Sequence, residues 1–387
     1  MNIAFVGCGY VADLYMQTLG NHLDLRLLGA FDRDGQRMSA FASCHGVKAY
    51  DSLQALLEDP ALDMVVNLTD PRSHAEVTRI ALDAGKHVFS EKPLASTLEE
   101  AQALVELAAA KGLHLACAPC THLSEGVQTL ARALRAGKLG RPLVAYAEMD
   151  TGRIPAGEPG AWRSLSGAPW PAKDEYELGC ALGDAGYQLA PLVQLFGPVR
   201  RVTALSACRL PEKGESVGAQ PGAPDLSMGL LEFDDGVVAR LSVSTLAPAD
   251  RSLRVVGSSA TATLGDVWDF PGQARMNPVG SSIVHRALRK AEAWMAGWAP
   301  GAALGTALVS PKPSTMKRTK GGGPRLDFAR GISVLAEAVR GGSNRLPTSL
   351  TLHLMEVSLA LQAPAGSAAQ VMRIQPDVPP LFDWAQG

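Results

Sequence analysis

The sequence predicts an α/β protein, with a doubly wound parallel sheet at the N-terminus and a C-terminal α+β domain built on an open, mostly antiparallel sheet. Strand-like and helix-like segments alternate over the first 120 residues, and after them strand-like segments follow one another in hairpin pairs. The chain has 387 residues, of which 47% are hydrophobic and 19% are charged. This length and this balance suit two ordered globular domains, each with its own core.

The first unit is a short apolar strand, a glycine turn and a helical pattern, NIAFVGCGYVADLYMQTL. In a turn of the form Gly-x-Gly-x-x-Ala, the first glycine permits the tight bend and the second lets a pyrophosphate approach the backbone. The small third residue lets the helix pack on the strand, and the helix N-terminus offers free N–H groups to phosphate. The turn therefore predicts a dinucleotide site formed by Gly7, Gly9, Tyr10, Val11 and Ala12.

A second strand, residues 23–32, ends at Asp32, which is about the expected distance after the glycine turn. A carboxylate at that place accepts hydrogen bonds from the ribose hydroxyls and repels a 2′-phosphate, so it favours NAD. Arg33 follows at once and can stack on adenine or pair with a 2′-phosphate. NADP therefore remains the alternative cofactor.

The alternation continues to residue 120, with helix-like segments at residues 51–59, 73–85 and 96–112 and strand-like segments at residues 62–70, 87–93 and 113–120. Parallel sheets of this kind bind ligands at the carboxyl ends of their strands. The polar residues at or just past these ends are Asn67, Thr69, His74, Glu91 and Lys92, and we expect all of them to contact cofactor.

Lys92 follows Glu91 at a strand end and precedes Pro93. A positioned ammonium can donate to a substrate oxygen as negative charge develops there during hydride transfer to a carbonyl. The alternative is an ordinary surface lysine.

The segment SEKPLASTLEEAQALVELA, together with GCGYVA, VVNLTDPRSHAEVTRIALDAGKHV and LRAGKLGRPL, resembles the glucose–fructose oxidoreductase/inositol dehydrogenase family, Gfo/Idh/MocA. The resemblance covers the first 145 residues well and the rest more loosely. It implies a Rossmann domain followed by an α/β domain, and an NAD(P)-dependent dehydrogenase or reductase that acts on a CH–OH carbon of a sugar, cyclitol or related alcohol. It places Lys92 between nicotinamide and substrate, and it implies a homo-oligomer, dimer or tetramer, formed through the C-terminal sheet.

The apolar stretch GCALGDAGYQLAP, residues 179–191, resembles the helix that closes the family's site, Gly-Gly-x-x-x-Asp-x-Gly-x-His. Asp184 and Gly186 match, but Gln188 stands where the family has a histidine that moves the proton. An amide has no useful pKa and cannot do that work. We therefore expect Asp184 to orient the substrate and Gln188 to bind one of its hydroxyls.

Two residues are candidates for the missing proton carrier. Tyr187 lies three residues after Asp184, on nearly the same helix face, and its phenol can relay a proton when Lys92 stabilises the anion. His122 follows the end of the fifth strand and is the other candidate. Alternatively, Tyr187 is a core aromatic. A rival interpretation of the whole chain, which Gln188 favours, is an NAD(P)-binding sensor or regulator without dehydrogenase turnover.

The loop GAPWPAKDEYELG lies just before this helix and carries Trp170, Lys173, Asp174 and Glu175. Aromatic faces stack on the C–H surface of a sugar while charged groups bind its hydroxyls, so Trp170 and Lys173 are predicted to contact substrate. The alternative is a solvated loop.

The second half predicts strands at residues 142–150, 199–208, 225–245 and 251–266, the last two being hairpins, and helices at residues 327–342 and 349–363. We assign residues 1–121 to the NAD(P)-binding domain, 122–365 to the second domain, with an insertion at about 272–325, and 366–387 to a C-terminal tail. An amphipathic helix at residues 281–298 is expected to pack on its own domain. A lid, an oligomer contact or a membrane-surface helix are the alternatives.

Composition excludes several other classes of protein. A net charge of −2 gives no general attraction to nucleic acid, and the longest uncharged run, residues 293–311, is broken by glycine and proline, which argues against a membrane span. The N-terminus has no basic n-region, so we expect no signal peptide, reduced thiols at all six cysteines and a cytoplasmic location. Cys117 and Cys120 form a lone C-x-x-C pair without a second one, so no metal site is predicted.

Overall fold

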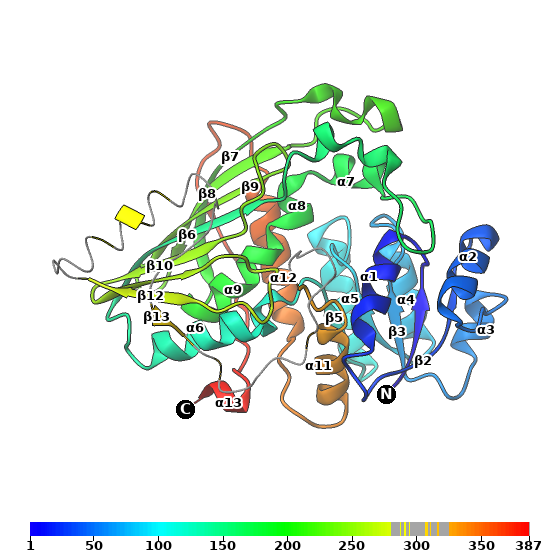
Figure 1. Ribbon diagram of the computed structural model, residues 1–387. Helices are drawn as coiled ribbons and strands as arrows, with labels where there is room; N and C mark the ends of the chain where they lie inside the picture. Colours follow the sequence, from blue (N-terminus) through cyan, green and yellow to red (C-terminus); the bar gives the residue numbers. More distant parts are fainter. Residues whose placement is uncertain are drawn as a thin grey trace.

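The structure is a computed structural model that describes residues 1–279 and 325–386, together with 287, 290, 291, 294, 306–308, 310 and 316. Two sheets lie side by side, with helices packed around and between them (Figure 1). The helix expected at residues 281–298 lies largely outside the described residues.

The first sheet confirms the predicted doubly wound fold: five parallel strands in the order β2-β1-β3-β4-β5. Its strands are β1 (Asn2–Val6), β2 (Arg26–Phe31), β3 (Met64–Asn67), β4 (His87–Ser90) and β5 (Leu115–Cys117). All four residues of β3 are buried, because helices cover both faces of such a sheet.

Five helices connect these strands: α1 (Tyr10–Leu19), α2 (Gly35–His45), α3 (Leu53–Leu57), α4 (His74–Asp83) and α5 (Leu98–Ala110). The side chains of Asp34, Ser52 and Thr97 cap α2, α3 and α5 by accepting from free backbone N–H groups. The sequence did not predict α2, whose apolar face is limited to Met38 and Phe41.

The described residues form a second sheet of nine strands in the order β13-β12-β11-β10-β6-β9-β8-β7-β14, antiparallel except for the parallel pair β6/β9. The strands are β6 (Pro142–Asp150), β7 (Val199–Ala207), β8 (Leu226–Phe233), β9 (Val238–Ser244), β10 (Leu253–Gly257), β11 (Ala260–Leu264), β12 (Arg275–Pro278), β13 (Thr306–Ala307) and β14 (Gln370–Val371). Both predicted hairpins, β8/β9 and β10/β11, are present. Alternate residues of β8 are buried, so one face of the sheet packs on the core.

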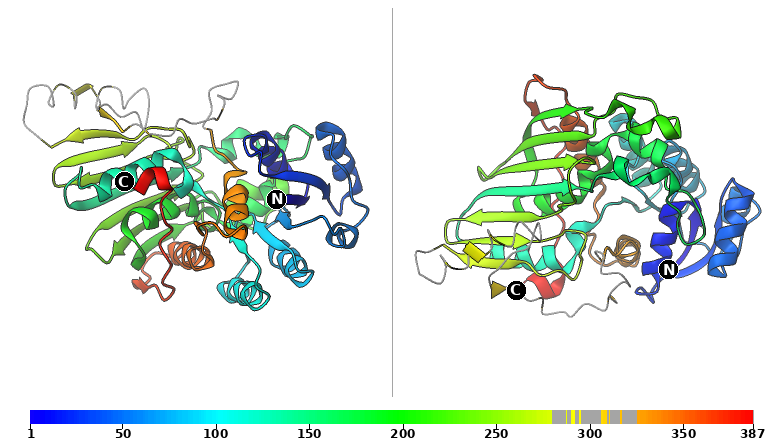
Figure 2. Two further views of the ribbon diagram at one scale, coloured as in Figure 1. Left: turned by 90° about the horizontal axis from the view of Figure 1, so that it is seen from below. Right: turned by 45° about the horizontal axis from the view of Figure 1, so that its top comes forward.

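The remaining helices lie on that buried face, in the loops or at the C-terminus. They are η1 (Thr121–Leu123), α6 (Glu125–Arg135), η2 (Ile154–Gly157), η3 (Pro159–Ala161), α7 (Ala172–Leu178), α8 (Cys180–Asp184), α9 (Gly186–Phe196), η4 (Pro211–Val217), α11 (Arg330–Val339), α12 (Thr348–Leu361) and α13 (Asp383–Gln386). Helices α6, α8, α9 and α12 share one hydrophobic core with the second sheet. Figure 1 and Figure 2 show α9 and α12 between the two sheets.

Helix α11 belongs to the core of the first domain, although the sequence assigned it to the second. Ile332 and Leu335 pack in the same cluster as residues of β1, β4 and α1. A Cβ at Gly331 would lie 2.6 Å from the ring of Phe89 on β4, so this position requires the smallest residue. Asp24, in the loop before β2, accepts hydrogen bonds from Ser333 and Arg340. The first domain is therefore closed by a segment about 200 residues further along the chain than its predicted end.

All six cysteines are free in the structure. Among the helices that the described residues form, none combines the length and the apolar character needed to cross a bilayer.

Candidate active site

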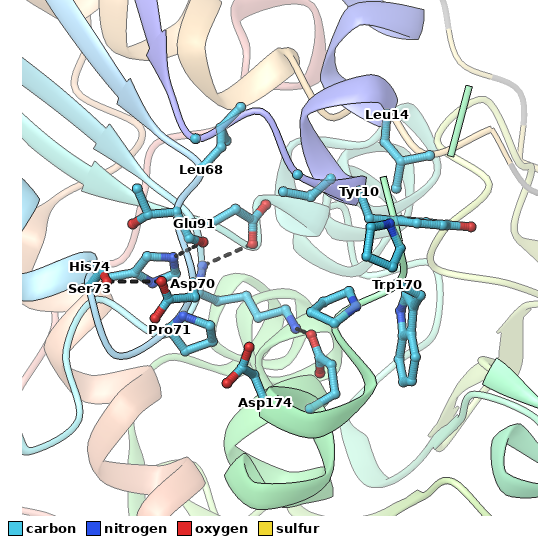
Figure 3. Close-up of a pocket in the computed structure, with 18 of the residues that line it drawn as sticks. Tyr10, Leu14, Leu68, Asp70, Pro71, Ser73, His74, Glu91, Trp170 and Asp174 are labelled. Carbon is cyan, nitrogen blue, oxygen red and sulfur yellow. Dashed lines mark hydrogen bonds and ion pairs between the residues drawn. The ribbon is translucent and has the colours of Figure 1, made fainter. Parts of the chain in front are cut away.

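A cavity of about 750 Å³ lies where the carboxyl ends of the first sheet's strands face helices α7, α8 and α9 (Figure 3). The glycine turn and the ends of β1, β3 and β4 line one half, and residues of the second domain line the other. This is the place where a doubly wound sheet binds its ligand.

The glycine turn has the geometry that a dinucleotide needs. Gly7 has φ +96°, and a Cβ there would lie 2.5 Å from the carbonyl carbon of Leu68, so only glycine fits. No atom lies within 4 Å of the Cβ position of Gly9, which leaves room for a pyrophosphate against the backbone. Tyr10 and Val11 line the cavity, whereas Ala12 is fully buried behind the turn. These residues fit the phosphates of NAD at the N-terminus of α1.

Asp32 is fixed at the end of the cofactor half of the cavity where we expect the adenosine. Its carboxylate accepts from the backbone N–H groups of Cys8 and Asp34, at 2.8 Å each, and lies 3.4 Å from Nε of Arg37. Arg33 lines the cavity too, with its guanidinium 3.4 Å from Asp70. The sequence did not identify Arg37, because its proximity to Asp32 depends on α2.

The predicted ligands at the end of β3 mainly hold the chain in place. Asn67 is fully buried and does not line the cavity: its amide donates to the carbonyl of His74 and to Thr78, and its oxygen accepts from the hydroxyl of Thr69 at 2.7 Å. His74 lies between the carbonyl oxygens of Thr69 and Pro93, at 3.0 and 2.7 Å, and burial lowers its pKa. Thr69 and His74 border the cavity, so of these three only Asn67 is placed away from a ligand.

Glu91 holds Lys92 in position. One carboxylate oxygen accepts from the phenol of Tyr15 at 2.8 Å, and the other accepts from the backbone N–H of Lys92 at 2.9 Å. Glu91 is 6% exposed and lines the cavity. Tyr15 was not predicted as a site residue, because its role depends on a contact between α1 and β4.

Lys92 lines the cavity, and its ammonium lies 3.3 Å from a carboxylate oxygen of Glu175 on α7. Burial alone would lower the pKa of Lys92, but the negative charge of Glu175, with Tyr187 and Asp184 as further neighbours, raises it above its ordinary value. Lys92 therefore stays a cation that can donate to an oxygen in the cavity.

Asp184 and Tyr187 border the same cavity from α8 and α9. The ring of Tyr187 packs edge-on against Trp268 with centroids 5.2 Å apart, and none of the described residues hydrogen-bonds its phenol. Burial raises the pKa of Tyr187 well above its usual range, while Lys92 acts in the opposite direction. Burial also raises the pKa of Asp184 to about 6, against the attraction of Lys92. A protonated phenol and an ammonium thus lie together in one enclosed space.

Gln188 points into the second sheet instead of the cavity. It is fully buried, and its amide nitrogen donates to the backbone carbonyls of Glu148, Arg251 and Ser252. Successive side chains on a helix differ by about 100° in direction, so Tyr187 and Gln188 face different surroundings. The predicted contact between Gln188 and a substrate hydroxyl does not fit this position.

His122 also lies away from the cavity. It is 1% exposed, and Nε2 lies 3.1 Å from the carbonyl oxygen of Arg345. Burial lowers its pKa to about 4, so the ring is neutral near pH 7. As a proton carrier it would need a path that the described residues do not provide.

Two tryptophans form the wall on the side of the second domain. Trp162 and Trp170 both line the cavity, with ring centroids 5.4 Å apart. Lys173, which was predicted beside Trp170, is exposed and does not border the cavity. Trp162 was missed because the loop that carries it has no recognisable pattern.

The loop with these tryptophans is tied to α1. Ser166 donates to Asp13 through its N–H at 3.1 Å and its hydroxyl at 2.7 Å, and His45 binds the other oxygen of Asp13. The thiol of Cys44 is also near, so that ligand atoms of Asp13, Cys44 and His45 lie within 4.8 Å of one another. Since both oxygens of Asp13 already have partners, we assign no ion to this cluster.

Comparison with known proteins matches both halves of the chain. The family model described as "Oxidoreductase family, NAD-binding Rossmann fold" matches residues 1–118, and the "GFO/IDH/MocA C-terminal domain" model matches residues 127–263. The chain is 32% identical over 158 residues to an uncharacterized oxidoreductase, C115.03, of Schizosaccharomyces pombe, which covers 41% of this chain and 40% of that protein. The chain thus aligns with less than half the length of that relative.

Two further proteins extend this likeness. The D-apiose dehydrogenase of Paraburkholderia graminis is 25% identical over 252 residues, or 65% of this chain and 62% of the relative. The WlbA dehydrogenase of Bordetella pertussis, solved in complex with NADH and UDP-GlcNAcA, superposes with a TM-score of 0.68 at 18% identity, over 97% of this chain and 99% of that one. At that identity the superposition supports the fold.

Proposed function

The chain belongs to the Gfo/Idh/MocA oxidoreductase family, and from this premise we propose that it transfers hydride between NAD(P) and a carbonyl or hydroxyl carbon of a sugar, a sugar derivative or another cyclic polyol. The proposal rests on one observation: the Lys92 ammonium and the Tyr187 phenol line the same cavity as the glycine turn. Bound NAD(P) supplies or accepts the hydride. The residues of this chain bind the oxygen of the reacting carbon, stabilise its charge and move its proton.

Each residue has a role that follows from its position. Lys92 donates to the oxygen of the carbonyl group and stabilises the negative charge that develops there. Tyr187 gives its proton to that oxygen in reduction and takes one back in oxidation. Asp184 binds a neighbouring hydroxyl, and Glu91 keeps the Lys92 backbone in place. Asp32 orients the adenosine ribose.

The sensor or regulator reading stays the alternative function. Gln188 favours it, because its amide donates to three carbonyls of the second sheet and moves no proton. A titratable group is still present in the cavity, one residue earlier in the helix.

Absorbance at the nicotinamide band tests the proposed function. We expect the purified chain with NADH or NADPH to reduce at least one member of a panel of keto-sugars and keto-cyclitols, or to oxidise the corresponding alcohols with NAD⁺ or NADP⁺. The Lys92→Met variant, which keeps the side-chain length, is the matched control and is expected to bind NADH without turnover. Tight NADH binding with no turnover on any member of a broad panel would support the regulator reading instead.

The two cofactors are expected to bind with different affinities. NADH should bind at least about tenfold more tightly than NADPH, because the Asp32 carboxylate lies where a 2′-phosphate would face like charge. Asp32→Ser should reduce this preference by about tenfold or more, since the carboxylate that faces a 2′-phosphate is then gone while the charges of Arg33 and Arg37 remain. Nicotinamide fluorescence titrations measure both affinities. Tighter NADPH binding by the unchanged chain would contradict the assignment and make the two arginines the selecting residues.

We also propose that the chain forms a homo-oligomer, a dimer or a tetramer, through the outer face of the second sheet. Tyr146, Leu205, Met228 and Leu230 are large apolar side chains on that face, and each is more than a third exposed. Ion pairs of Arg201 with Glu232 and of Arg240 with Glu148 flank them. An apolar face rimmed by charges is typical of a subunit contact.

A further inference from the structure

The substrate half of the cavity carries more carboxylates than cations. Asp174 (Figure 3) and Glu175 on α7 and Asp184 on α8 line it, and among the described residues they share it with a single ammonium, that of Lys92. Lys92 is matched by Glu175 at 3.3 Å. Within the described part of the chain, Asp174 and Asp184 form no hydrogen bond or ion pair of their own. Two carboxylates therefore face the cavity without a dedicated cation.

The other basic side chains of the cavity are engaged elsewhere. Among the described residues that line it, Arg33 and Arg37 lie at the adenosine end beside Asp70 and Asp32. His74 is held between two backbone carbonyls. None of these groups is available to neutralise α7 or α8.

Several buried polar groups in this half point independently to a ligand rich in hydroxyls. The phenol of Tyr176, the hydroxyl of Thr245 and the indole N–H of Trp268 are buried, line the cavity and find no partner among the described residues. Tyr176 is only 4% exposed as a residue, and Tyr187 only 8%. Buried polar groups are almost always hydrogen-bonded, so these groups indicate a bound molecule that offers several donors and acceptors.

Aromatic rings line the same cavity as these carboxylates. Trp162 and Trp170 are 5.4 Å apart, and Trp170 packs edge-on against Tyr176 at 6.1 Å. Ring faces next to carboxylates attract an organic cation, since the ring quadrupole and the acid act in the same sense. They would bind an anion poorly.

We propose that the substrate is a polyhydroxylated compound that carries a protonated amine, an amino sugar or an aminocyclitol, and that Asp174 binds the ammonium group, with Asp184 on a neighbouring hydroxyl, while a carboxylate or phosphate beside Asp174 is rejected. The proposal rests on the proposed function, because it names the substrate class of the same site. Burial and Asp70 raise the pKa of Asp174, and the charges of Arg72 and Lys173, which form no ion pair with it, act in the opposite direction without reversing the rise. Glu175 raises the pKa of both Asp174 and Asp184, so the negative charges act on one another as well. A bound cation removes that repulsion, and a bound anion adds to it.

Three small probes of equal size test the charge preference without knowledge of the sugar skeleton. They are 2-amino-1,3-propanediol, glycerol and glycerate, titrated into the NADH-loaded protein at constant ionic strength, with tryptophan fluorescence as the readout because Trp162 and Trp170 line the site. We expect the aminodiol to bind at least about tenfold more tightly than glycerol, and glycerate to bind more weakly than both. Equal binding of the three probes, tighter binding of glycerate or no binding of the aminodiol would overturn the proposal.

A pair of variants on α7 locates the preference. Asp174→Asn is nearly isosteric, and it should reduce the advantage of the aminodiol over glycerol by about tenfold while NADH affinity stays unchanged. Glu177→Gln removes the same charge from the same helix, but Glu177 pairs with Arg72 and does not line the cavity, so this variant should keep the preference. Loss of the preference in both variants, or in neither, would contradict a role for Asp174.

The two proposals fail in different ways. If neither NADH nor NADPH binds, or if no hydride transfer is found on the broad panel, the proposed function fails. If NADH binds and neutral or acidic sugars are turned over better than their amino counterparts, the function stands and the substrate class is wrong.

Discussion

Replacing Tyr187 with phenylalanine is expected to lower kcat by about 10²- to 10⁴-fold, the usual contribution of a general acid. The substitution removes only the hydroxyl, so the edge-on contact of the ring with Trp268 remains. Burial raises the pKa of the phenol, so it is protonated near pH 7, and the charge of Lys92 acts in the opposite direction and so favours release of the proton to the oxygen that Lys92 binds. Steady-state kinetics on a substrate found in the panel measure the loss, and an unchanged melting temperature shows that packing survives.

Tyr176 supplies the matched control for this prediction. It is a buried tyrosine that lines the same cavity, and its phenol also lacks a partner among the described residues. Tyr176→Phe should change KM more than kcat, because it removes a contact to substrate and no proton carrier. Normal turnover by Tyr187→Phe together with an inactive His122→Ala variant would make Tyr187 a core aromatic and reassign the proton transfer to His122.

Replacing Lys92 with methionine is expected to lower kcat by about 10²-fold or more and to leave the dissociation constant of NADH nearly unchanged. The ammonium is the positive group of the substrate half that can meet a developing alkoxide, and its charge is kept by the neighbouring carboxylates. A methionine fills similar space without a donor. Single-turnover rates at saturating substrate separate this effect from weaker binding.

Lys92→Arg distinguishes charge from geometry. It keeps the positive charge, but a planar guanidinium next to Glu175 is drawn into a two-point ion pair and away from the substrate oxygen. We therefore expect partial activity at most. An unchanged kcat in Lys92→Met would mean that Lys92 is only a wall of the cofactor site.

The first domain could be predicted from the sequence because its signals are local. The glycine turn, the acid at the end of β2 and the capped helices each lie within a few residues, and their geometry follows from backbone sterics and from the period of the hydrophobic pattern. Gly7 is the clearest case, since its positive φ and its contact with Leu68 allow no side chain. The hairpins of the second sheet were predictable for the same reason.

The roles of Tyr187 and Gln188 could not be predicted in the same way. The motif was aligned by its spacing from Asp184, which placed Gln188 at the substrate. In the structure α8 ends at Asp184 and α9 begins at Gly186, so the spacing does not describe one regular helix across this point. The direction of a side chain depends on how α9 packs against β6 and β10, which is tertiary information.

The remaining site residues depend on contacts between distant segments. Tyr15 reaches Glu91 across 76 positions of the chain, and Lys92 reaches Glu175 across 83. Ser166 reaches Asp13 across 153 positions. No local pattern encodes such pairs, and without a set of related sequences their partners become visible only when the domains are packed together.

The placement of α11 has a consequence for how the chain acquires its structure during synthesis. The first sheet is complete once β5 has been made, yet Ile332 and Leu335, which cover part of its core, follow more than 200 residues later. A nascent chain that ends in the second domain therefore leaves apolar surface of the first sheet open to solvent and to chaperones. Because one helix near the C-terminus joins both ends of the sequence in a single core, the domains lose their order together, and calorimetry on the whole chain should record one cooperative transition.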